Sequence, residues 1–549
     1  MSAFQTHIPL PRPQPFRSRS VCRRCRAPVR SVAQNAAVSS VKPSQKPASA
    51  QSQSITPRHE DYSQWYLDVI TAADLSESAP VKGCLVIKPH GYAIWELLRD
   101  KLDSAIKASG AKNAYFPLLI PQSFLSKEAE HVEGFAKECA VVTHHRLRAD
   151  PDAPPGTLQP DPDAQLEENL VVRPTSETII WYMFGRWIQS YRDLPLMLNQ
   201  WANVVRWEMR TRPFLRTAEF LWQEGHTAHA DAEEAHDKAR EMIQVYRDIA
   251  ENWLALPVVV GRKSPSERFA GAEETYTIEA MMQNGWALQA GTSHFLGQNF
   301  AKAFDVQYKA PDGTKQYVWA TSWGMTTRMI GALIMTHSDD VGLVLPPNVA
   351  PIQIVLVLIF KNEKEQELVT SFAKGAADRL REVGIRIEVD DRPNMRPGAK
   401  YYEWERKGVP LRMEIGPRDA GKGAVFAAKR LGGKKWSIPV DDAFEDNAQE
   451  VLTEIHTQML ENARQRLMSR TSRPSSYEEL KQSLGQGGES QGFFVVPWKC
   501  DDENEKKVKD ETKATLRCYP MDEQDDVKGR TCIYSGEPAT HMAIFARAY

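Results

Sequence analysis

The longest uninterrupted apolar run of this chain is short, at seven residues over positions 354–360. A helix that crosses a membrane needs about 20 apolar residues, so the sequence predicts no transmembrane helix and no membrane partner. A run of seven is instead typical of a buried β-strand. Just before it, Pro346 and Pro347 break regular structure. We therefore expect a domain boundary at this point, with a separate domain on each side.

Length and cysteine content set further limits on the fold. The 549 residues are enough for about three or four domains of ordinary size. The seven cysteines are odd in number and scattered along the chain. This pattern does not resemble a disulfide framework, and it favours a reducing compartment.

The start of the chain is basic and contains no acidic residue before Glu60. It is rich in Arg, Ser, Ala and Pro and lacks the apolar stretch of a secretory signal, which is typical of an organellar transit peptide. We expect a transit peptide or disordered leader over residues 1–54, and localisation in the chloroplast stroma, the mitochondrial matrix or both. The alternative is a disordered basic arm that binds nucleic acid. The basic residues are Arg12, Arg17, Arg19, Arg23, Arg24, Arg26, Arg30, Lys42, Lys46 and Arg58.

The remaining chain has the pattern of an α+β protein with several domains. In residues 55–345 the expected strands outnumber the helices that could cross between parallel strands, so a mostly antiparallel sheet flanked by helices is predicted. Residues 350–445 alternate strands and helices and predict a small α/β domain. Residues 446–549 predict a linker helix followed by a small α/β C-terminal domain. The main expected strands of the first domain lie at 114–120, 196–207, 286–290 and 317–319, and the main helices at 92–106, 232–254 and 326–336.

One group of charged and aromatic residues has the chemistry of a nucleotide site. Arg206 and Glu208 are two apart on an expected strand and would share one face. A guanidinium binds a phosphate or a carboxylate, and a carboxylate accepts from an exocyclic amine. Phe220, four residues after Arg216, could stack on a base. The pattern predicts an ATP pocket without a P-loop; a solvated charged hairpin is the alternative.

These residues, with the segment Gly324-Met325-Thr326-Thr327-Arg328, resemble motifs 2 and 3 of the class II aminoacyl-tRNA synthetases. Three further segments resemble the prolyl-tRNA synthetase family, a similarity that runs over residues 61–549. The segments are Arg173-Pro174-Thr175-Ser176-Glu177, Trp222-Gln223-Glu224-Gly225-His226-Thr227 and Gly291-Thr292-Ser293-His294.

The resemblance implies a class II sheet, an anticodon-binding domain and the family's C-terminal domain. It also implies a homodimer that uses ATP with Mg²⁺, L-proline and tRNA(Pro) to make prolyl-tRNA for organellar translation. The chain is similar to the eukaryotic and archaeal form, since only 65 residues separate Glu224 from Gln289. We therefore expect no inserted editing domain, and any editing to act in trans.

The resemblance also implies the roles of individual residues. Arg206 and Arg328 are the expected catalytic residues, and Arg206 would hold both the α-phosphate and the carboxylate of proline. The expected ATP-binding residues are Arg206, Glu208, Arg216, Phe220, Gln289, Thr292 and Arg328. The expected proline-binding residues are Thr175, Glu177, Arg206, Trp222, Glu224, His226 and His294.

In the α/β domain, Glu405, Arg412 and Arg418 match the anticodon-reading positions of the family. Unpaired guanines offer N–H donors to a carboxylate and O6 and N7 acceptors to arginine, which suits a proline anticodon. Ordinary surface charges on an α/β domain are the alternative.

The sequence contains two candidate positions for a metal site, and both are disfavoured. Related chains often bind a structural zinc through four cysteines in the C-terminal domain, but here Lys499 and Asn504 stand at the first two ligand positions and only Cys532 remains. One thiolate cannot complete a tetrahedral site, so no structural zinc is predicted. A catalytic zinc on His226 and His229 is disfavoured because residues three apart on a strand face opposite sides.

Two other functions remain alternatives. A threonine-specific synthetase would place zinc-binding Cys and His residues in its pocket, and this sequence lacks that set. A catalytically inactive, synthetase-like RNA-binding or regulatory protein would have lost a motif residue. Five such residues are all present, namely Arg206, Glu208, Arg216, Gln289 and Arg328.

Overall fold

The computed structural model describes residues 54–129, 138–484 and 492–549. The predicted leader, residues 1–54, therefore lies outside the described residues apart from Ser54. Among the described residues, no helix is both long enough and apolar enough to cross a membrane.

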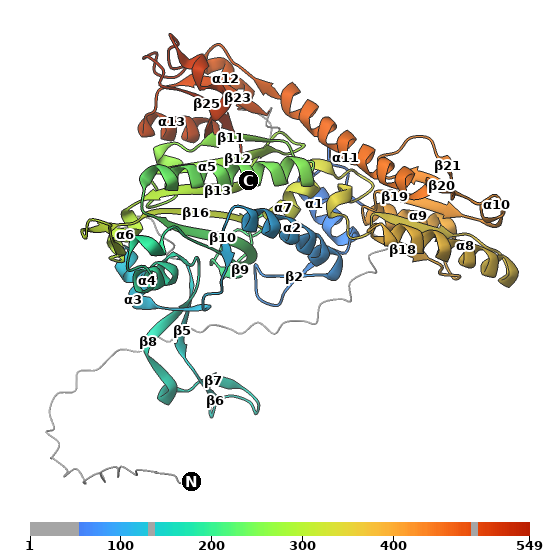
Figure 1. Cartoon of the computed structure of the whole chain (residues 1–549), viewed down its shortest axis with the longest axis horizontal. Helices are drawn as coiled ribbons and strands as arrows, with labels where there is room; N and C mark the ends of the chain where they lie inside the picture. Colours follow the sequence, from blue (N-terminus) through green and yellow to red (C-terminus); the bar gives the residue numbers. More distant parts are fainter. Residues whose placement is uncertain (1–53, 130–137, 485–491) are drawn as a thin grey trace, which may run out of the picture. The chain divides into compact units, whose positions relative to one another are not determined.

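A sheet of eleven strands forms the centre of the structure (Figure 1). Its strand order is β22-β23-β25-β24-β11-β12-β13-β16-β10-β9-β3. All neighbours are antiparallel except two pairs, β3 with β9 and β22 with β23. The mostly antiparallel sheet predicted for the first domain is thus confirmed. Its strands in that domain are β3 (Lys112–Asn113), β9 (Leu196–Val205), β10 (Glu219–His229), β11 (Val258–Arg262), β12 (Glu274–Met281), β13 (Ala287–Gly297) and β16 (Trp319–Thr326).

Helices with apolar faces cover this sheet. Helix α5 (Ala232–Asp248) packs most extensively on the sheet and covers β12, β13 and β16. Asp231 caps its first turn by accepting from the N–H groups of Glu233 and Glu234. The helix expected over 232–254 continues beyond α5 as a π-helical turn, Ile249–Trp253. The other covering helices are α1 (Tyr62–Ala72), α2 (Pro89–Ala108) and α7 (Arg328–His337), and all contribute to one apolar core.

A second, three-stranded sheet lies in residues 119–172 and has the order β4-β8-β5. The strand expected over 114–120 is wrong, because β3 ends at Asn113 and only the short β4, which begins at Leu119, overlaps this segment. Pro117 interrupts the segment, and proline has no N–H for a strand ladder. The elements of this region are β4 (Leu119–Pro121), α3 (Gln122–Ala129), β5 (Ala140–His144), β6 (Leu147–Ala149), β7 (Leu158–Pro160), β8 (Gln165–Val172) and α4 (Glu177–Trp187).

Residues 354–439 form the predicted α/β domain around a five-stranded sheet, β18-β17-β19-β20-β21. The seven-residue apolar run becomes β17, which is buried and parallel to both of its neighbours. Strand β21 was missed by the sequence analysis. The elements are β17 (Ile354–Leu358), α8 (Glu363–Glu382), β18 (Ile387–Asp390), α9 (Pro397–Arg406), β19 (Leu411–Ile415), α10 (Pro417–Gly421), β20 (Ala424–Lys429) and β21 (Trp436–Pro439).

A single long helix, α11 (Phe444–Ser469), runs through the domain boundary expected at 445/446. Its first half packs into the core of the α/β domain through Phe444, Ala448 and Leu452. The helix therefore belongs partly to that domain and partly to the connection that follows.

The C-terminal segment continues the central sheet instead of building an isolated one. Strand β24 pairs with β11 through Gly261 opposite Pro520 and Arg262 opposite Tyr519. In Figure 1 the red C-terminal strands accordingly lie beside β11 and β12. The elements are β22 (Thr471–Ser472), α12 (Tyr477–Leu484), β23 (Phe493–Trp498), α13 (Asp502–Thr512), β24 (Thr515–Pro520) and β25 (His541–Ala546).

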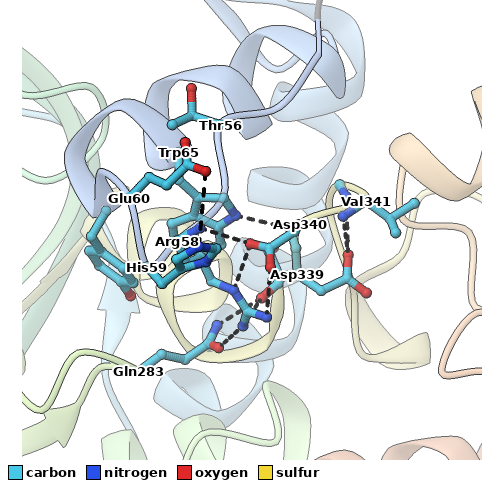
Figure 2. A network of polar contacts seen from close by, with 12 residues as sticks. Thr56, Arg58, His59, Glu60, Trp65, Gln283, Asp339, Asp340 and Val341 are labelled. Atoms are coloured by element: carbon cyan, nitrogen blue, oxygen red, sulfur yellow. Dashed lines mark hydrogen bonds and ion pairs between the residues drawn. The ribbon is translucent and has the colours of Figure 1, made fainter.

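Figure 2 shows how the first described residues are held by polar contacts to the turn at 339–340. The Arg58 guanidinium pairs with Asp340 at 2.9 Å and also donates to Gln283. The Trp65 indole donates to the carbonyl oxygen of Asp339 at 2.9 Å. The Asp339 carboxylate in turn binds Arg430 of the α/β domain at 2.7 and 2.8 Å. The turn at 339–340 thus joins the start of the described chain to both domains.

Candidate active site

One pocket, of about 290 Å³, opens on the central sheet. Its walls come from β10, β13 and β16, from the loop between β9 and β10, and from the start of α7. All thirteen residues predicted to bind ATP or proline line it. They are Thr175, Glu177, Arg206, Glu208, Arg216, Phe220, Trp222, Glu224, His226, Gln289, Thr292, His294 and Arg328.

A buried arginine fixes the segment that carries Thr175 and Glu177. The guanidinium of Arg173 donates to the carbonyl oxygens of Phe116 and Asn203 at 2.7 and 2.8 Å. This holds the segment beside the end of β9. Glu177 then starts α4 and points into the pocket.

Arg206 lies at the centre of the pocket wall. Its Nε donates to the Pro174 carbonyl oxygen at 3.0 Å, and its guanidinium carbon lies 5.4 and 5.5 Å from the ring centres of Phe220 and Trp222. Burial lowers the pKa of Arg206, although nearby carboxylates such as Glu177 oppose this. The side chain is held by a carbonyl and two rings and keeps its charge available to a ligand.

The expectation that Arg206 and Glu208 share a strand face is wrong. Strand β9 ends at Val205, and the chain then turns so that the Glu208 N–H donates to the Arg206 carbonyl oxygen at 2.7 Å. The Glu208 carboxylate pairs with Arg216 at 3.3 Å. Arg206 and Glu208 still line the pocket, but they reach it from a loop. The ion pair between Glu208 and Arg216 must open if these two side chains contact different parts of a nucleotide.

Arg328 starts α7 at another side of the pocket. Its guanidinium donates to two backbone carbonyl oxygens, of Leu215 at 3.1 Å and of Gln289 at 3.4 Å. Burial, together with the charges of Arg216 and Arg206, lowers the pKa of Arg328 to about 10. Within the described residues, neither Arg206 nor Arg328 forms a salt bridge. Two cations without a carboxylate partner indicate a pocket for an anionic ligand.

Hydrogen bonds connect the polar residues around Glu224 in the pocket. The buried Glu224 carboxylate accepts from Ser176 at 2.5 Å, from Gln200 at 2.6 Å and from His226 at 3.1 Å. Burial lowers the pKa of His226, but the hydrogen bond to Glu224 and the negative charges of Glu177 and Glu224 together outweigh burial, so the pKa is raised. Glu224 is therefore fully engaged by the protein itself.

Glu177 is better placed to bind a ligand cation. It accepts from the Thr175 hydroxyl, and burial raises the pKa of its carboxyl group. His294, which lines the same pocket, shares a 2.9 Å hydrogen bond with Thr275. Burial lowers the pKa of His294 to about 3, so its ring is neutral. Glu177 and His294 thus offer one negative and one neutral group to a small zwitterion.

His229 lies on the other side of β10 from His226 and pairs with Glu234 at 3.2 Å. In the part of the chain that the structure describes, no three His, Cys, Asp or Glu side chains gather as metal ligands. At the positions where related chains place zinc ligands, the Lys499 ammonium pairs with Glu537 and Cys532 is buried.

The sequence analysis missed one wall of the pocket. It consists of residues from β12 and from the loop between β11 and β12, and none of them stands in a motif. The clearest hint of this wall in the sequence is the pair of adjacent charges at Glu267 and Arg268. Such a pair is also typical of an ordinary solvated loop. The missed residues are Lys263, Glu267, Arg268, Phe269 and Thr275.

The predicted anticodon-reading residues lie in the α/β domain and are partly brought together. Arg412 on β19 pairs with Glu405 of α9 at 2.6 Å and with Glu414 at 3.3 Å. Its guanidinium carbon also lies 4.1 Å from the ring centre of Tyr401. Arg418, on α10, is exposed. Glu405 and Arg412 thus form one unit, with Arg418 on a neighbouring element.

Comparison with known proteins identifies the family. Three family descriptions match the chain: "tRNA synthetase class II core domain (G, H, P, S and T)" over residues 161–337, "Anticodon binding domain" over 353–448, and "Prolyl-tRNA synthetase, C-terminal" over 477–549. The chain is 54% identical over 497 residues to a proline--tRNA ligase of Bacteroides fragilis, which covers 90% of this chain and 99% of the relative. The corresponding protein of Porphyromonas gingivalis is 53% identical over 495 residues, with 90% and 99% covered.

Solved structures agree with this. A prolyl-tRNA synthetase from Cryptosporidium parvum, complexed with halofuginone and AMPPNP, superposes with a TM-score of 0.82 at 37% identity and covers 90% of this chain and 99% of that chain. The same enzyme complexed with L-proline and AMP gives a TM-score of 0.82 at 35% identity, with 92% and 99% covered. The predicted family and fold class are confirmed: the chain belongs to the prolyl-tRNA synthetases, the proline--tRNA ligases of class II.

Proposed function

We propose that this prolyl-tRNA synthetase makes prolyl-adenylate in the pocket around Arg206 and charges tRNA(Pro) for translation in a chloroplast, a mitochondrion or both. The observation that carries the site assignment is the pair of arginines, Arg206 and Arg328, that lack a carboxylate partner beside the buried Glu177. Arginines suit the phosphates of ATP, and Glu177 suits the ammonium group of proline.

The proposed reaction has two steps. The carboxylate oxygen of proline attacks the α-phosphorus of ATP, a P–O bond forms, and pyrophosphate leaves with the electrons of the broken P–O bond. A terminal ribose hydroxyl of the tRNA then attacks the carbonyl carbon of the adenylate and gives up its proton to water. The bond between the carbonyl carbon and the phosphate oxygen breaks, and AMP leaves with its electrons. No general base is needed in the first step because the nucleophile is already a carboxylate.

The arrangement of the protein groups accounts for the first step. Arg206 lies between the Glu177 end and the Phe220 ring and can neutralise both the attacking carboxylate and the α-phosphate. Arg328 and Arg216 would bind the outer phosphates, and Phe220 and Glu208 the adenine. Positioning and charge neutralisation are the main contributions that a protein makes to such a transfer.

Mg²⁺ fits the residues present. Gln289 and Thr292 line the pocket on β13 and offer neutral oxygen atoms, and Mg²⁺ in nucleotide sites takes few protein ligands besides phosphate oxygens and water. We propose that these two side chains hold the ion, which when bound screens the phosphate charge.

A homodimer is also proposed. Large aromatic side chains are exposed on and around α4, which suits a protein partner better than water. Those with the largest exposed fractions are Tyr115 (72%), Trp187 (45%), Tyr182 (41%) and Tyr191 (37%). Sedimentation of the purified enzyme tests this: a monomer at working concentration would contradict it.

The segment between Glu224 and Gln289 supports the proposed lack of an editing domain. Between β10 and β13 the chain forms α5, the π-helical turn, β11 and β12, all of which belong to the central sheet or its cover. Mischarged tRNA would then have to be cleared by another protein.

The organellar role rests on the composition of the leader and on the anchoring of Thr56 and Arg58. The Thr56 N–H donates to Asp68 at 2.9 Å and the Arg58 N–H to Asp340 at 3.0 Å. Cleavage before Thr56 would leave these bonds intact. Import of a fusion of residues 1–54 to a fluorescent protein into isolated chloroplasts and mitochondria tests the proposal, and retention outside both would contradict it.

Exchange of pyrophosphate into ATP tests the amino acid and the pocket together. We expect exchange with proline, weak exchange with alanine and cysteine, and none with threonine. One methylene is worth only about 1–3 kcal/mol, so size alone rejects small amino acids poorly. Exchange with threonine above that with proline would contradict the proposal.

Lowering the pH is expected to raise the KM for proline before it affects the KM for ATP. Because burial raises the pKa of Glu177, this carboxylate takes up a proton at a higher pH than a free glutamate, and the protonated form no longer attracts the ammonium group of proline. Arg328, with a pKa of about 10, stays charged. Exchange kinetics from about pH 7.5 down to about pH 5 measure both constants.

The Glu177→Gln variant is the control for this pH effect. It removes the titrating group, so its KM for proline should be high at every pH and should not change further as the pH falls. A KM for proline that rises equally in the variant would assign the effect to another group.

A further inference from the structure

A buried charge cluster joins the C-terminal segment to the pocket wall that the motifs did not reveal. Its centre is Glu279 on β12, whose side chain has no exposed surface. One oxygen accepts from Lys263 at 2.8 Å and from Thr277 at 3.0 Å, and the other accepts from Nε and Nη2 of Arg517 at 3.0 and 2.9 Å. Arg517 belongs to β24.

The cluster lies on the same face of the sheet as the pocket. Residues two apart on a strand share a face, so Thr275, Thr277 and Glu279 form one row along β12. Thr275 lines the pocket and holds His294. Lys263 lines the pocket as well, and its N–H donates to the Thr275 carbonyl oxygen at 2.8 Å.

The C-terminal segment fixes Lys263 at two points. The Lys263 ammonium donates to the Arg517 carbonyl oxygen at 2.7 Å, in addition to its bond with Glu279. The next residue, Ser264, donates to the carboxylate of Glu505 on α13 at 3.0 Å. The position of this pocket wall is thus set by residues more than 200 positions later in the chain.

The cluster also acts on Arg328 electrostatically. Burial lowers the pKa of Arg328, Glu279 opposes that shift, and Arg517 adds to it. The three groups Lys263, Glu279 and Arg517 carry a net positive charge when all are ionised. Without Arg517, one oxygen of a fully buried carboxylate would lose both of its donors, and Glu279 would attract the remaining cations, Lys263 and Arg328, away from their present positions.

We propose that Arg517 is a positioning residue of the ATP pocket. Through Glu279 and Lys263 it fixes the end of the pocket where Arg328 lies. The inference rests on the proposed assignment of that end to the phosphates of ATP. It gives the C-terminal segment a role in nucleotide binding although none of its side chains lines the pocket.

The test compares Arg517→Met with Arg517→Lys and with Arg473→Met as the matched control. Arg473 also lies in the C-terminal part of the chain and pairs with Glu523 at 2.8 Å, but it is about half exposed and does not line the pocket. We expect Arg517→Met to raise the KM for ATP in the exchange reaction by about fivefold to tenfold, as for a lost charged hydrogen-bond pair. The dissociation constant of AMPPNP should rise equally, and the KM for proline should stay unchanged.

Arg517→Lys keeps the charge and should regain most of the ATP affinity, whereas Arg473→Met should match the unaltered enzyme. A purely structural role of Arg517 predicts a different result, since partial unfolding lowers the concentration of active sites and leaves the KM for ATP unchanged. That result, or equal rises in both KM values, would overturn the inference.

Two further variants distinguish a failure of this inference from a failure of the proposed ATP site. If Arg517 acts through Glu279, the double variant Glu279→Gln, Arg517→Met should show less than the product of the two single effects, because neither buried group is then left charged and unpaired. Arg328→Ala tests the pocket assignment itself. If that variant binds AMPPNP normally, the proposed ATP site fails; if it loses AMPPNP and Arg517→Met does not, only the present inference fails.

Discussion

Replacing Arg206 by alanine is expected to reduce proline-dependent ATP–pyrophosphate exchange by about a thousandfold or more, as for the loss of a group that stabilises developing charge in a transition state. In the proposed reaction Arg206 faces both anions. The Pro174 carbonyl oxygen and the rings of Phe220 and Trp222 hold its guanidinium at the pocket wall, and alanine removes this positive charge. The loss should therefore appear mainly in kcat.

Arg210→Ala is the matched control for this experiment. Arg210 lies in the same loop between β9 and β10 but is exposed and outside the pocket lining. It should leave exchange essentially unchanged. Near-normal exchange in Arg206→Ala, or an equal loss in Arg210→Ala, would contradict the role assigned to Arg206.

Replacing Arg412 by alanine is expected to raise the KM for tRNA(Pro) by about tenfold to a hundredfold, the range of one lost bidentate base contact. Arg412 is presented by β19 with its guanidinium held by Glu405 and Glu414, so its direction is fixed before any base arrives. The ATP pocket lies in another domain, and exchange without tRNA should be preserved.

The control for Arg412→Ala is Arg381→Ala. Arg381 is an exposed residue of α8 in the same domain and pairs with Asp378 at 3.0 Å. Aminoacylation and exchange are measured on both variants, together with thermal unfolding, because the buried partner Glu414 loses a donor in Arg412→Ala. A parallel loss of exchange and aminoacylation would contradict an anticodon role.

Much of the pocket could be predicted because its residues stand in local motifs. Thirteen side chains that line one pocket are spread over six short segments of sequence, and the motifs identify each segment without any knowledge of how they meet. The helix α5 was equally accessible, because Asp231 and the acidic first turn mark its start.

What could not be predicted depends on pairing between distant segments. Lys263, Glu279 and Arg517 look like surface charges in the sequence, since such residues are mostly exposed, and only the fold places them together in the interior. The turn after Val205 was missed because the alternation of apolar and polar residues continues past the last ladder bond. The pairing of β11 with β24 uses backbone groups, which leave no mark in the side chains.

This pairing has a consequence for the order in which the chain can fold. Strand β11 emerges from the ribosome more than 250 residues before β24, the partner that closes its open side through Arg262 opposite Tyr519. Until residues 515–520 have been made, β11 presents free N–H and C=O groups, and exposed strand edges of this kind template aggregation. Prematurely terminated chains would keep that edge and lack Arg517. We therefore expect them to aggregate and to bind ATP weakly. Nascent chains of this enzyme should therefore depend on chaperones until the final strands are complete.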